Sequence, residues 1–408
     1  MDASDTAWIL ISIALVLLMT PGLAFFYGGL VRDKQVLNTI KMSFVALGVI
    51  SVEWALIGYS LAFAPGSAWL GGLGWLGLAG VDAQPQPLYS DTLPHLLFMA
   101  FQMMFAVITP ALISGAVVGR MKFKAYLLFI LFWGLVIYNP IAHWVWGPGG
   151  WIGEIGALDF AGGTVVHISA GVSALVAAIV LGPRKQLSNS SNRPHNVPFV
   201  VLGASLLWFG WFGFNAGSAL AADGIAALAC VTTMLGAASA VVTWIILEML
   251  QAGKTSASGA AIAAVVGLVA ITPAAGFVTP LAALAIGAAG STASYLTIKA
   301  IKRTGLDDTL DVFACHGIAG IVGSLLTGVF ATTSVNPGGA DGLLYGNAYL
   351  LVPQLISVVA AGLYAAVGTG IILLILDKVV GLRADETAET DGIDLVEHAE
   401  NAYSNTLM

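Results

Sequence analysis

The chain has 408 residues, of which 58% are hydrophobic and only 9% are charged. A soluble domain carries roughly one quarter charged residues, so this composition excludes an ordinary soluble protein and indicates an integral membrane protein. The formal net charge of −7 belongs to the acidic segment that begins after Ala384, because the rest of the chain carries as many basic as acidic residues.

Apolar runs of about 20 residues recur along the whole chain, and each is long enough to cross a bilayer as a helix. We predict an all-α polytopic fold, because a helix satisfies its own backbone hydrogen bonds in lipid and the alternating strands of a barrel are not evident. In chain order the eleven predicted spans are 8–31, 42–64, 94–118, 124–145, 161–181, 197–220, 224–251, 257–275, 278–300, 310–331 and 349–379.

The basic residues indicate how these spans are oriented. All fifteen lysines and arginines end or follow odd-numbered spans, and the opposite loops contain none, although those loops include the long segments 65–93 and 332–348. Cytoplasmic loops are enriched in Lys and Arg. We therefore predict eleven transmembrane helices with the N-terminus outside and the C-terminus inside.

Two histidines inside predicted spans share a sequence pattern. His167 follows Asp159 by eight residues in span 5, and His316 follows Asp308 at the same spacing in span 10. Spans 1–5 and 6–10 are therefore predicted to be two five-helix repeats of opposite direction, because five is odd, with a long eleventh helix added. The glycines that follow the two histidines by four residues are Gly171 and Gly320.

A two-fold axis in the membrane plane would bring His167 and His316 together near mid-depth. Ionisable side chains inside a membrane are costly and usually mark a pathway or relay. Paired neutral imidazoles would offer donors and acceptors to a small polar solute. The alternative is two unrelated core histidines bonded to backbone carbonyls. A metal site is not expected, since no third ligand is evident at that depth. An enzyme is not expected either, because the sequence shows no pair of a nucleophile and a base.

The other histidines and the carboxylates near the two patterns have simpler interpretations. Carboxylates just before a helix accept its free amide hydrogens and meet the positive end of its dipole. A role in attracting substrate is the alternative for Asp159. The residues expected to have this structural role are Asp159, Asp308 and Asp311. The histidines expected at span ends, in a loop or in the tail, where water reaches them, are His95, His143, His195 and His398.

With these motifs the chain resembles the ammonium transporter (Amt/Mep/Rh) family, in its bacterial and archaeal type, over nearly its full length. The resemblance implies a homotrimer in the inner (plasma) membrane with a pore in each subunit, carrying ammonium or ammonia, with no cofactor and no nucleic-acid partner. Methylammonium is a candidate second substrate. The matching stretches are "AHWVWG" at 142–147, "DFAGGTVVHISAGVSALVAAIVLGPR" at 159–184, "WFGFNAGSA" at 211–219, "DDTLDVFACHGIAGIVG" at 307–323 and "GLRADETAETDGIDLVEHAENAY" at 381–403.

The resemblance also implies roles for single residues. Ammonium would be recruited in an outer aromatic vestibule, lose its proton at a phenylalanine gate and cross a hydrophobic pore as ammonia, past His167 and His316. Trp144 is expected to be structural. The residues that match the recruitment site are Trp146, Ser218 and Phe105. Those that match the gate are Phe105, Phe214 and Phe101.

Residues 381–408 form a short acidic tail behind the transmembrane domain of residues 1–380. Composition alone predicts a disordered tail, whereas the resemblance implies that it packs on the cytoplasmic face and that a trimeric PII-type signalling protein docks there. The tail residues that match are Gly381, Asp391, Asn401 and Tyr403.

Two further function classes stay open at this stage. An ammonium sensor with the same fold and little flux is the main alternative, although such sensors usually carry an appended signalling domain. A gas channel of the Rh type is disfavoured because Trp146 and Ser218 are retained.

Overall fold

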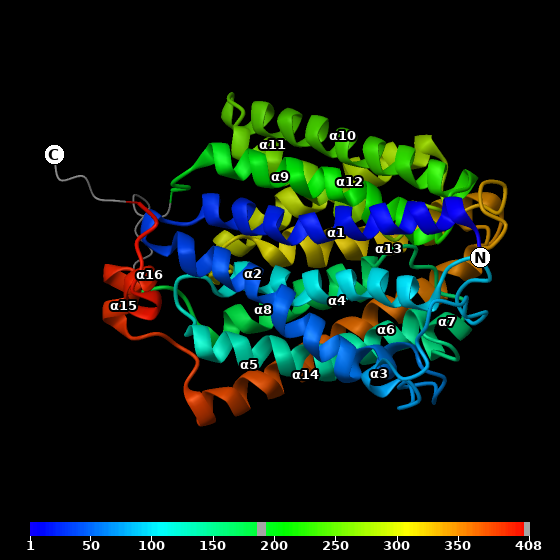
Figure 1. Ribbon diagram of the computed structural model, residues 1–408. Coiled ribbons are helices and arrows are strands. Elements are labelled where there is room, and N and C mark those ends of the chain that lie inside the picture. The colour runs from blue at the N-terminus through cyan, green and yellow to red at the C-terminus, as the bar shows by residue number, and fades with distance from the viewer. Residues whose placement is uncertain (186–192, 404–408) are drawn as a thin grey trace.

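The computed structural model describes residues 1–185 and 193–403, which form a bundle of long helices (Figure 1). Ten helices within the described residues are long and apolar enough to cross a membrane, and the shorter apolar helix α11 (Ala257–Ile271) accounts for the remaining predicted span. The prediction of an all-helical multi-pass membrane protein is therefore confirmed.

The first half of the chain contains helices that are interrupted by short turns of tighter or wider winding. Its α-helices are α1 (Ala3–Leu30), α2 (Val36–Glu53), α3 (Tyr59–Phe63), α4 (His95–Val117), α5 (Phe123–Trp133), α6 (Asn139–Trp146), α7 (Trp151–Glu154) and α8 (Ser169–Leu181). Its π-helical turns are η2 (Trp54–Gly58), η4 (Gly134–Tyr138) and η5 (Gly163–Ile168), and its 3-10 turns are η1 (Asp33–Gln35) and η3 (Leu76–Leu78).

The second half repeats this construction. Its α-helices are α9 (Val197–Trp211), α10 (Gly224–Ala252), α11, α12 (Pro280–Lys302), α13 (Ala319–Phe330), α14 (Leu351–Val380), α15 (Glu386–Asp391) and α16 (Ile393–His398). Its π-helical turns are η6 (Phe212–Ala216) and η8 (Phe313–Ile318), and its 3-10 turns are η7 (Gly217–Ala219), η9 (Leu343–Tyr345) and η10 (Ala348–Leu350).

Polar residues at the loop ends set where several long helices begin. The side chains of Asp2, Asp223 and Ser256 accept hydrogen bonds from amides in the first turns of α1, α10 and α11. Thr279 does the same for α12, where Pro280 follows at the first helical position. Such caps satisfy amides that have no partner inside the helix.

The two halves meet along α1. In Figure 1, α9, α10, α11 and α12 lie above α1, and α2, α5, α8 and α14 lie below it. Helix α1 packs lengthwise on α9, and α8 packs between α4 and α14. The π-helical turns η5 and η8 contact each other between the halves. This arrangement brings the two histidine-bearing segments to the centre of the bundle.

Ion pairs tie together the loops at the end of the bundle where the C-terminal tail lies. Two nitrogens of the Arg184 guanidinium each lie 2.8 Å from a carboxylate oxygen of Asp307. Arg120 is fully buried and donates to the carbonyl oxygen of Asp307 and to the hydroxyl of Thr309, both at 2.6 Å. Burial lowers the pKa of Arg120 to about 10. The carboxylate of Asp307 thus lies between two guanidinium groups.

The described part of the tail is folded, so the disorder predicted from composition is wrong for it. Helices α15 and α16 lie outside the end of the bundle (Figure 1). Asp394 of α16 accepts hydrogen bonds from the amides of Leu37 and Asn38 in the first turn of α2, at 2.9 and 2.8 Å. The tail therefore caps a helix whose own N-cap residue, Gln35, makes no capping bond. Residues 404–408 of the predicted tail lie outside the described residues.

Candidate functional site

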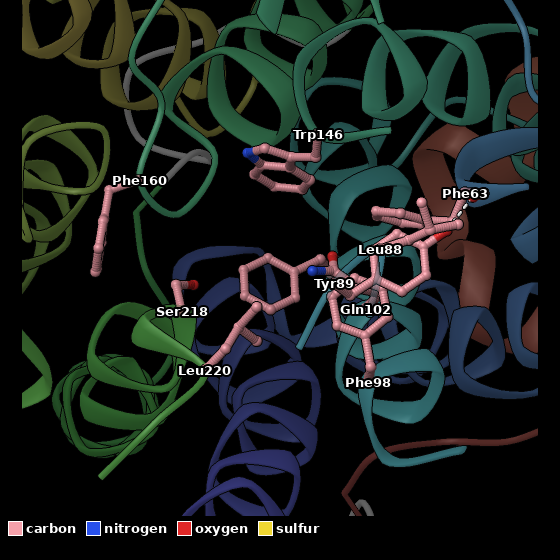
Figure 2. A pocket seen from close by; sticks show the side chains of 10 residues that line it. Phe63, Leu88, Tyr89, Phe98, Gln102, Trp146, Phe160, Ser218 and Leu220 are labelled. Atoms are coloured by element: carbon pink, nitrogen blue, oxygen red, sulfur yellow. Dashed lines mark hydrogen bonds between the residues drawn. The ribbon is translucent and has the colours of Figure 1, made fainter. Parts of the chain in front are cut away.

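A pocket, called the outer pocket after the side of the membrane predicted for it, opens at the end of the bundle where the chain begins. It has a volume of about 220 Å³. Figure 2 shows Trp146 from the end of α6 and Ser218 from η7 on different sides of this pocket. The indole nitrogen of Trp146 donates to the carbonyl oxygen of Asp159 at 2.9 Å, and the hydroxyl of Ser218 donates to that of Phe214 at 2.8 Å. The Ser218 oxygen keeps its lone pairs as acceptors.

Phe105 lines this pocket and packs against two further phenylalanine rings. The rings of Phe105 and Phe214 lie 4.3 Å apart between centroids, and Phe101 meets Phe105 edge-on at 5.0 Å. Phe105 also meets the indole of Trp146 edge-on at 5.9 Å. All three phenylalanines are at most 1% exposed. The structure therefore brings together the residues that the sequence assigned to recruitment and to the gate.

His167 and His316 lie directly beyond these rings and contact each other. Their Nδ1 atoms are 3.2 Å apart, and the two rings are nearly parallel, with centroids at 5.3 Å. The ring of His167 also stacks on Trp211 at 5.4 Å and on Phe214 at 6.0 Å. A hydrogen bond between two Nδ1 atoms requires one donor and one acceptor, so at least one of the imidazoles is neutral.

Two small cavities flank the histidine pair. The first is lined by both histidines, Trp211, Phe214 and aliphatic side chains, and the second by His316, Tyr27 and further apolar residues. Each has a volume of about 10 Å³, which is about the space that one water molecule needs. The site thus contains two small, mostly apolar cavities beside the histidine pair, each with room for a single small molecule.

The glycines that follow the histidines explain how the two segments approach so closely. Gly171 lies against the backbone of Gly317, next to His316, so that a Cβ there would overlap it. A Cβ on Gly320 would come within 3.2 Å of the Cβ of His167. Each glycine therefore makes room for the histidine segment of the other half, a reciprocal contact that gives the sequence pattern its physical reason.

The three carboxylates beside the histidine segments differ in what they bind. Asp159 accepts hydrogen bonds from four successive amides, those of residues 162–165, at 2.6 to 3.1 Å. Asp308 accepts one from Phe313 at 2.7 Å. Asp311 was expected to cap as well, but its side chain lies 3.7 Å from Lys302 and makes no capping bond to a described residue. Burial raises the pKa of Asp159, and burial with the charge of Asp311 raises that of Asp308 to about 7.

The expectation that water reaches His95 and His143 is wrong. The two side chains are 2% and 0% exposed. His95 shares a 2.6 Å hydrogen bond with the hydroxyl of Tyr59, and His143 contacts the carbonyl oxygens of Ala62 and Ser67. Tyr59 and Ala62 belong to α3. Segment 64–94 folds back over this end of the bundle, supplies Ser67 and packs Trp75 on the ring of His95. His195 and His398 are partly exposed, as expected.

Two glutamines near the site were not predicted from the sequence. Gln102 lines the outer pocket, and its amide oxygen is buried with no hydrogen-bond partner among the described residues (Figure 2). Gln354 is buried beside the segment that precedes His167. Both are single amides within apolar spans, and a polar residue in such a run is a signal that could have identified them. The aromatic residues of the pocket that were also missed are Phe63, Tyr89, Phe98 and Phe160.

Long apolar helices around small buried cavities and a pair of imidazoles are typical of a multi-pass membrane channel or transporter. The model of the Ammonium Transporter Family matches residues 7–403. The chain therefore belongs to the ammonium transporter family, as its motifs indicated.

Individual relatives agree with this assignment. An ammonium transporter from Bacillus subtilis is 51% identical, with all of both chains covered. Among solved structures, that of Candida albicans Mep2 superposes with a TM-score of 0.90 at 33% identity and covers 98% of this chain and 93% of its own. A structure described as a sensor Amt protein reaches 0.88 at 30% identity, with 97% and 98% covered.

Proposed function

We propose that the protein transports ammonium across the plasma membrane in three steps. Ammonium is recruited between Trp146 and Ser218, gives up its proton at the phenylalanine gate, and crosses as ammonia past His167 and His316. The observation that carries this proposal is the bonded pair of imidazoles between two cavities of about 10 Å³. Methylammonium is the second substrate that we propose.

The outer pocket suits a small cation. An indole face attracts a desolvated cation by about 2 kcal/mol, and it attracts potassium as well as ammonium. Ammonium can in addition donate a hydrogen bond to the Ser218 oxygen, which a spherical ion cannot do. Recruitment therefore concentrates both ions and favours ammonium only in part.

The inner path provides the main discrimination. A cavity of about 10 Å³ has no room for a hydration shell, and an unpaired ion in an apolar site costs many kcal/mol. Ammonium can avoid this cost by leaving its proton behind, whereas potassium cannot. The imidazoles then supply donors and acceptors to neutral ammonia. The proton left at the gate follows separately along the hydrogen bond that the imidazoles share, so that net positive charge crosses with each ammonia.

Reconstitution in liposomes tests the transport proposal. We expect a pulse of ammonium to give a sustained current, and an equal pulse of potassium to give none. A change of internal pH without current would indicate a gas channel of the Rh type. If neither a current nor a change of internal pH is observed, the sensor alternative is favoured, and the similarity to the sensor Amt structure is a further reason to consider it.

Replacement of the histidines tests their role in the pore. We expect His167→Ala and His316→Ala each to change the ammonium current or its selectivity over potassium, because each removes one partner of the 3.2 Å contact. Wild-type current and selectivity in both variants would refute the role of the pair.

We further propose that the two five-helix units are inverted repeats, with the N-terminus outside and the C-terminus inside. The proposal is supported by the basic residues, several of which contact the tail at one end of the bundle. Single cysteines introduced in segment 65–93 and in the tail, treated in intact cells with a maleimide that cannot cross membranes, test the orientation. Labelling of the tail but not of the loop would overturn it.

We also propose a homotrimer with one pore in each subunit, and a regulatory tail of residues 381–408 on which a trimeric PII-type protein docks. Family resemblance supports both, and the folded tail with exposed Glu386 and Asp391 offers a docking surface. Light scattering corrected for detergent tests the trimer. Co-purification with a PII protein, with and without ATP-type effectors, tests the partner, and no complex in either condition would remove it.

A further inference from the structure

The side-chain amide of Gln354 holds a segment that leads into the candidate site. Gln354 lies in the first turn of α14, outside the two predicted five-helix units, and is 1% exposed. Its Oε1 accepts a hydrogen bond from the amide of Leu158 at 2.6 Å, and its Nε2 donates to the carbonyl oxygens of Leu158 at 3.0 Å and Ser324 at 2.7 Å. One side chain thus binds both backbone polar groups of a single residue and joins it to α13.

The position of Leu158 gives this clamp its significance. Leu158 precedes Asp159, and a rigid peptide plane joins the two residues. The carbonyl oxygen of this plane belongs to Leu158 and accepts the hydrogen bond from Gln354. The carboxylate of Asp159 binds the first amides of the turn that carries His167. The carbonyl oxygen of Asp159 accepts the indole hydrogen of Trp146. Fixing Leu158 therefore fixes the residue on which Trp146 is anchored.

The segment has no regular structure of its own to hold it. Residues 155–162 form neither helix nor strand, and within the described residues no other hydrogen bond reaches the backbone of Leu158. Backbone polar groups that are shielded from water need hydrogen-bond partners. Gln354 supplies these partners, and the other end of its clamp lies on α13, the helix that follows His316.

We propose that Gln354 is a positioning residue for ammonium recruitment. It contacts no substrate and acts through Leu158 and Asp159 on the indole of Trp146. The inference rests on the proposed transport function, and it assigns to the long eleventh helix a part in substrate affinity. Releasing Leu158 would let the carbonyl of Asp159 move and the indole face turn away from the outer pocket, which weakens recruitment more than it slows the passage of ammonia.

Two substitutions and a matched control separate positioning from plain stability. Gln354→Met keeps the length of the side chain and removes all three hydrogen bonds, while Gln354→Glu keeps only the bond from the amide of Leu158. Thr369→Val is the control, because Thr369 is also fully buried on α14 and bonds to Ser173 at 2.8 Å, but farther along the helix.

The readouts are the half-saturating ammonium concentration, the maximal current in liposomes and the thermal unfolding midpoint. We expect Gln354→Met to raise the half-saturating concentration about tenfold with a smaller change in maximal current, as is expected when binding is lost. Gln354→Glu should lie between Gln354→Met and wild type. Thr369→Val should lower the unfolding midpoint and leave the half-saturating concentration unchanged.

A Gln354→Met protein that is destabilised like Thr369→Val, yet has the wild-type half-saturating concentration, would overturn the inference and leave the transport function standing. If Gln354→Met does not fold, Gln354→Glu carries the same comparison. A wild-type protein without any ammonium-dependent current would overturn the proposed function and the inference together. The wild-type measurement therefore distinguishes failure of the proposed function from failure of the inference alone.

Discussion

Gly171→Ala is the most direct test of how closely the two histidine segments must cross. A Cβ at this position would lie closer than 3.0 Å to the backbone nitrogen of Gly317 and 3.0 Å from the carbonyl carbon of His316. Ordinary contact of a Cβ begins at 3.4 Å, so the segments must separate by more than 0.4 Å. The atoms concerned are backbone atoms, which cannot rotate away as a flexible side chain can.

The separation has an expected size in stability and a consequence for the pore. Overpacking of a tight interior costs about 1–3 kcal/mol, and the rigid partner favours the upper end. Because Gly171 lies next to the segment of His316, the displacement also lengthens the 3.2 Å contact between the imidazoles beyond hydrogen-bond range. We therefore expect a lower unfolding midpoint in detergent and a loss of ammonium current in liposomes.

Gly362→Ala is the matched control. Gly362 lies within α14, and a Cβ there would meet Ile168 and Val172 at 3.9 Å, which is ordinary contact. Replacing a helical glycine by alanine without strain stabilises by about 0.5–1 kcal/mol. We expect unchanged current and an equal or higher unfolding midpoint. Equal stability and current in the Gly171→Ala and Gly362→Ala variants would refute the reasoning from close approach.

Three further predictions concern charged groups at the edges of the spans. Asp159→Asn keeps an acceptor for only half of its four amide bonds, so we expect about 2–3 kcal/mol lower stability, measured by thermal unfolding. Asp307→Asn removes the carboxylate that lies 3.9 Å from the buried guanidinium of Arg120, and we expect a loss of about 3 kcal/mol or more in the same assay. Burial and the ammonium of Lys41 lower the pKa of His398 below its ordinary 6.5, so the docked tail prefers neutral His398. We therefore expect docking to be complete above pH 6.5 and to weaken as the pH falls below it. Limited proteolysis of the tail measures this change.

Controls and contrary outcomes differ for these three. Asp91→Asn, at an exposed position, should leave the unfolding midpoint unchanged. If it lowers the midpoint as much as Asp159→Asn or Asp307→Asn does, the loss reflects removal of any negative charge and not of these contacts. His398→Gln cannot gain a proton in this range, so its tail should be cleaved at the same rate at pH 7.5 and pH 5.5. Cleavage of the wild-type tail that does not rise at low pH would contradict the assigned sign.

The sequence predicts the spans and the histidine pair because both leave a signal along the chain. Hydropathy marks the helices, and the equal spacing from Asp159 to His167 and from Asp308 to His316 marks the repeat. The start of the second span was missed by six residues, 42 being predicted where the helix begins at Val36. The residues ahead of position 42 include the polar Asn38, Thr39 and Lys41, and the tail residue that caps this helix lies more than 350 positions away in the chain.

What the sequence does not predict depends on contacts between distant segments or on local backbone geometry. His95 and His143 lie at span ends, yet Trp75 and Ser67 of the loop between the second and third spans contact them. Asp311 adopts a positive φ of 58°, and its carboxylate meets Lys302 and not the amides of the next turn. The acidic tail folds because Arg383 and Arg32 contact Glu389, which composition cannot reveal.

The π-helical turns have a consequence for how the lengths of related chains can vary. Such a turn is an α-helix with one residue inserted, and each further α-helical residue advances the helix by about 100°. A relative that lost one residue within 163–168 would regain plain α-helical winding there and keep the residues after it in place, whereas loss of one residue from an α-helical part of the same span would rotate everything after it by that angle. Gaps of a single residue inside a membrane span are therefore informative in this protein: a gap in the turn of His167 or of His316 leaves the side chains after it on the same side, and a gap elsewhere in the span turns a different set toward the histidines.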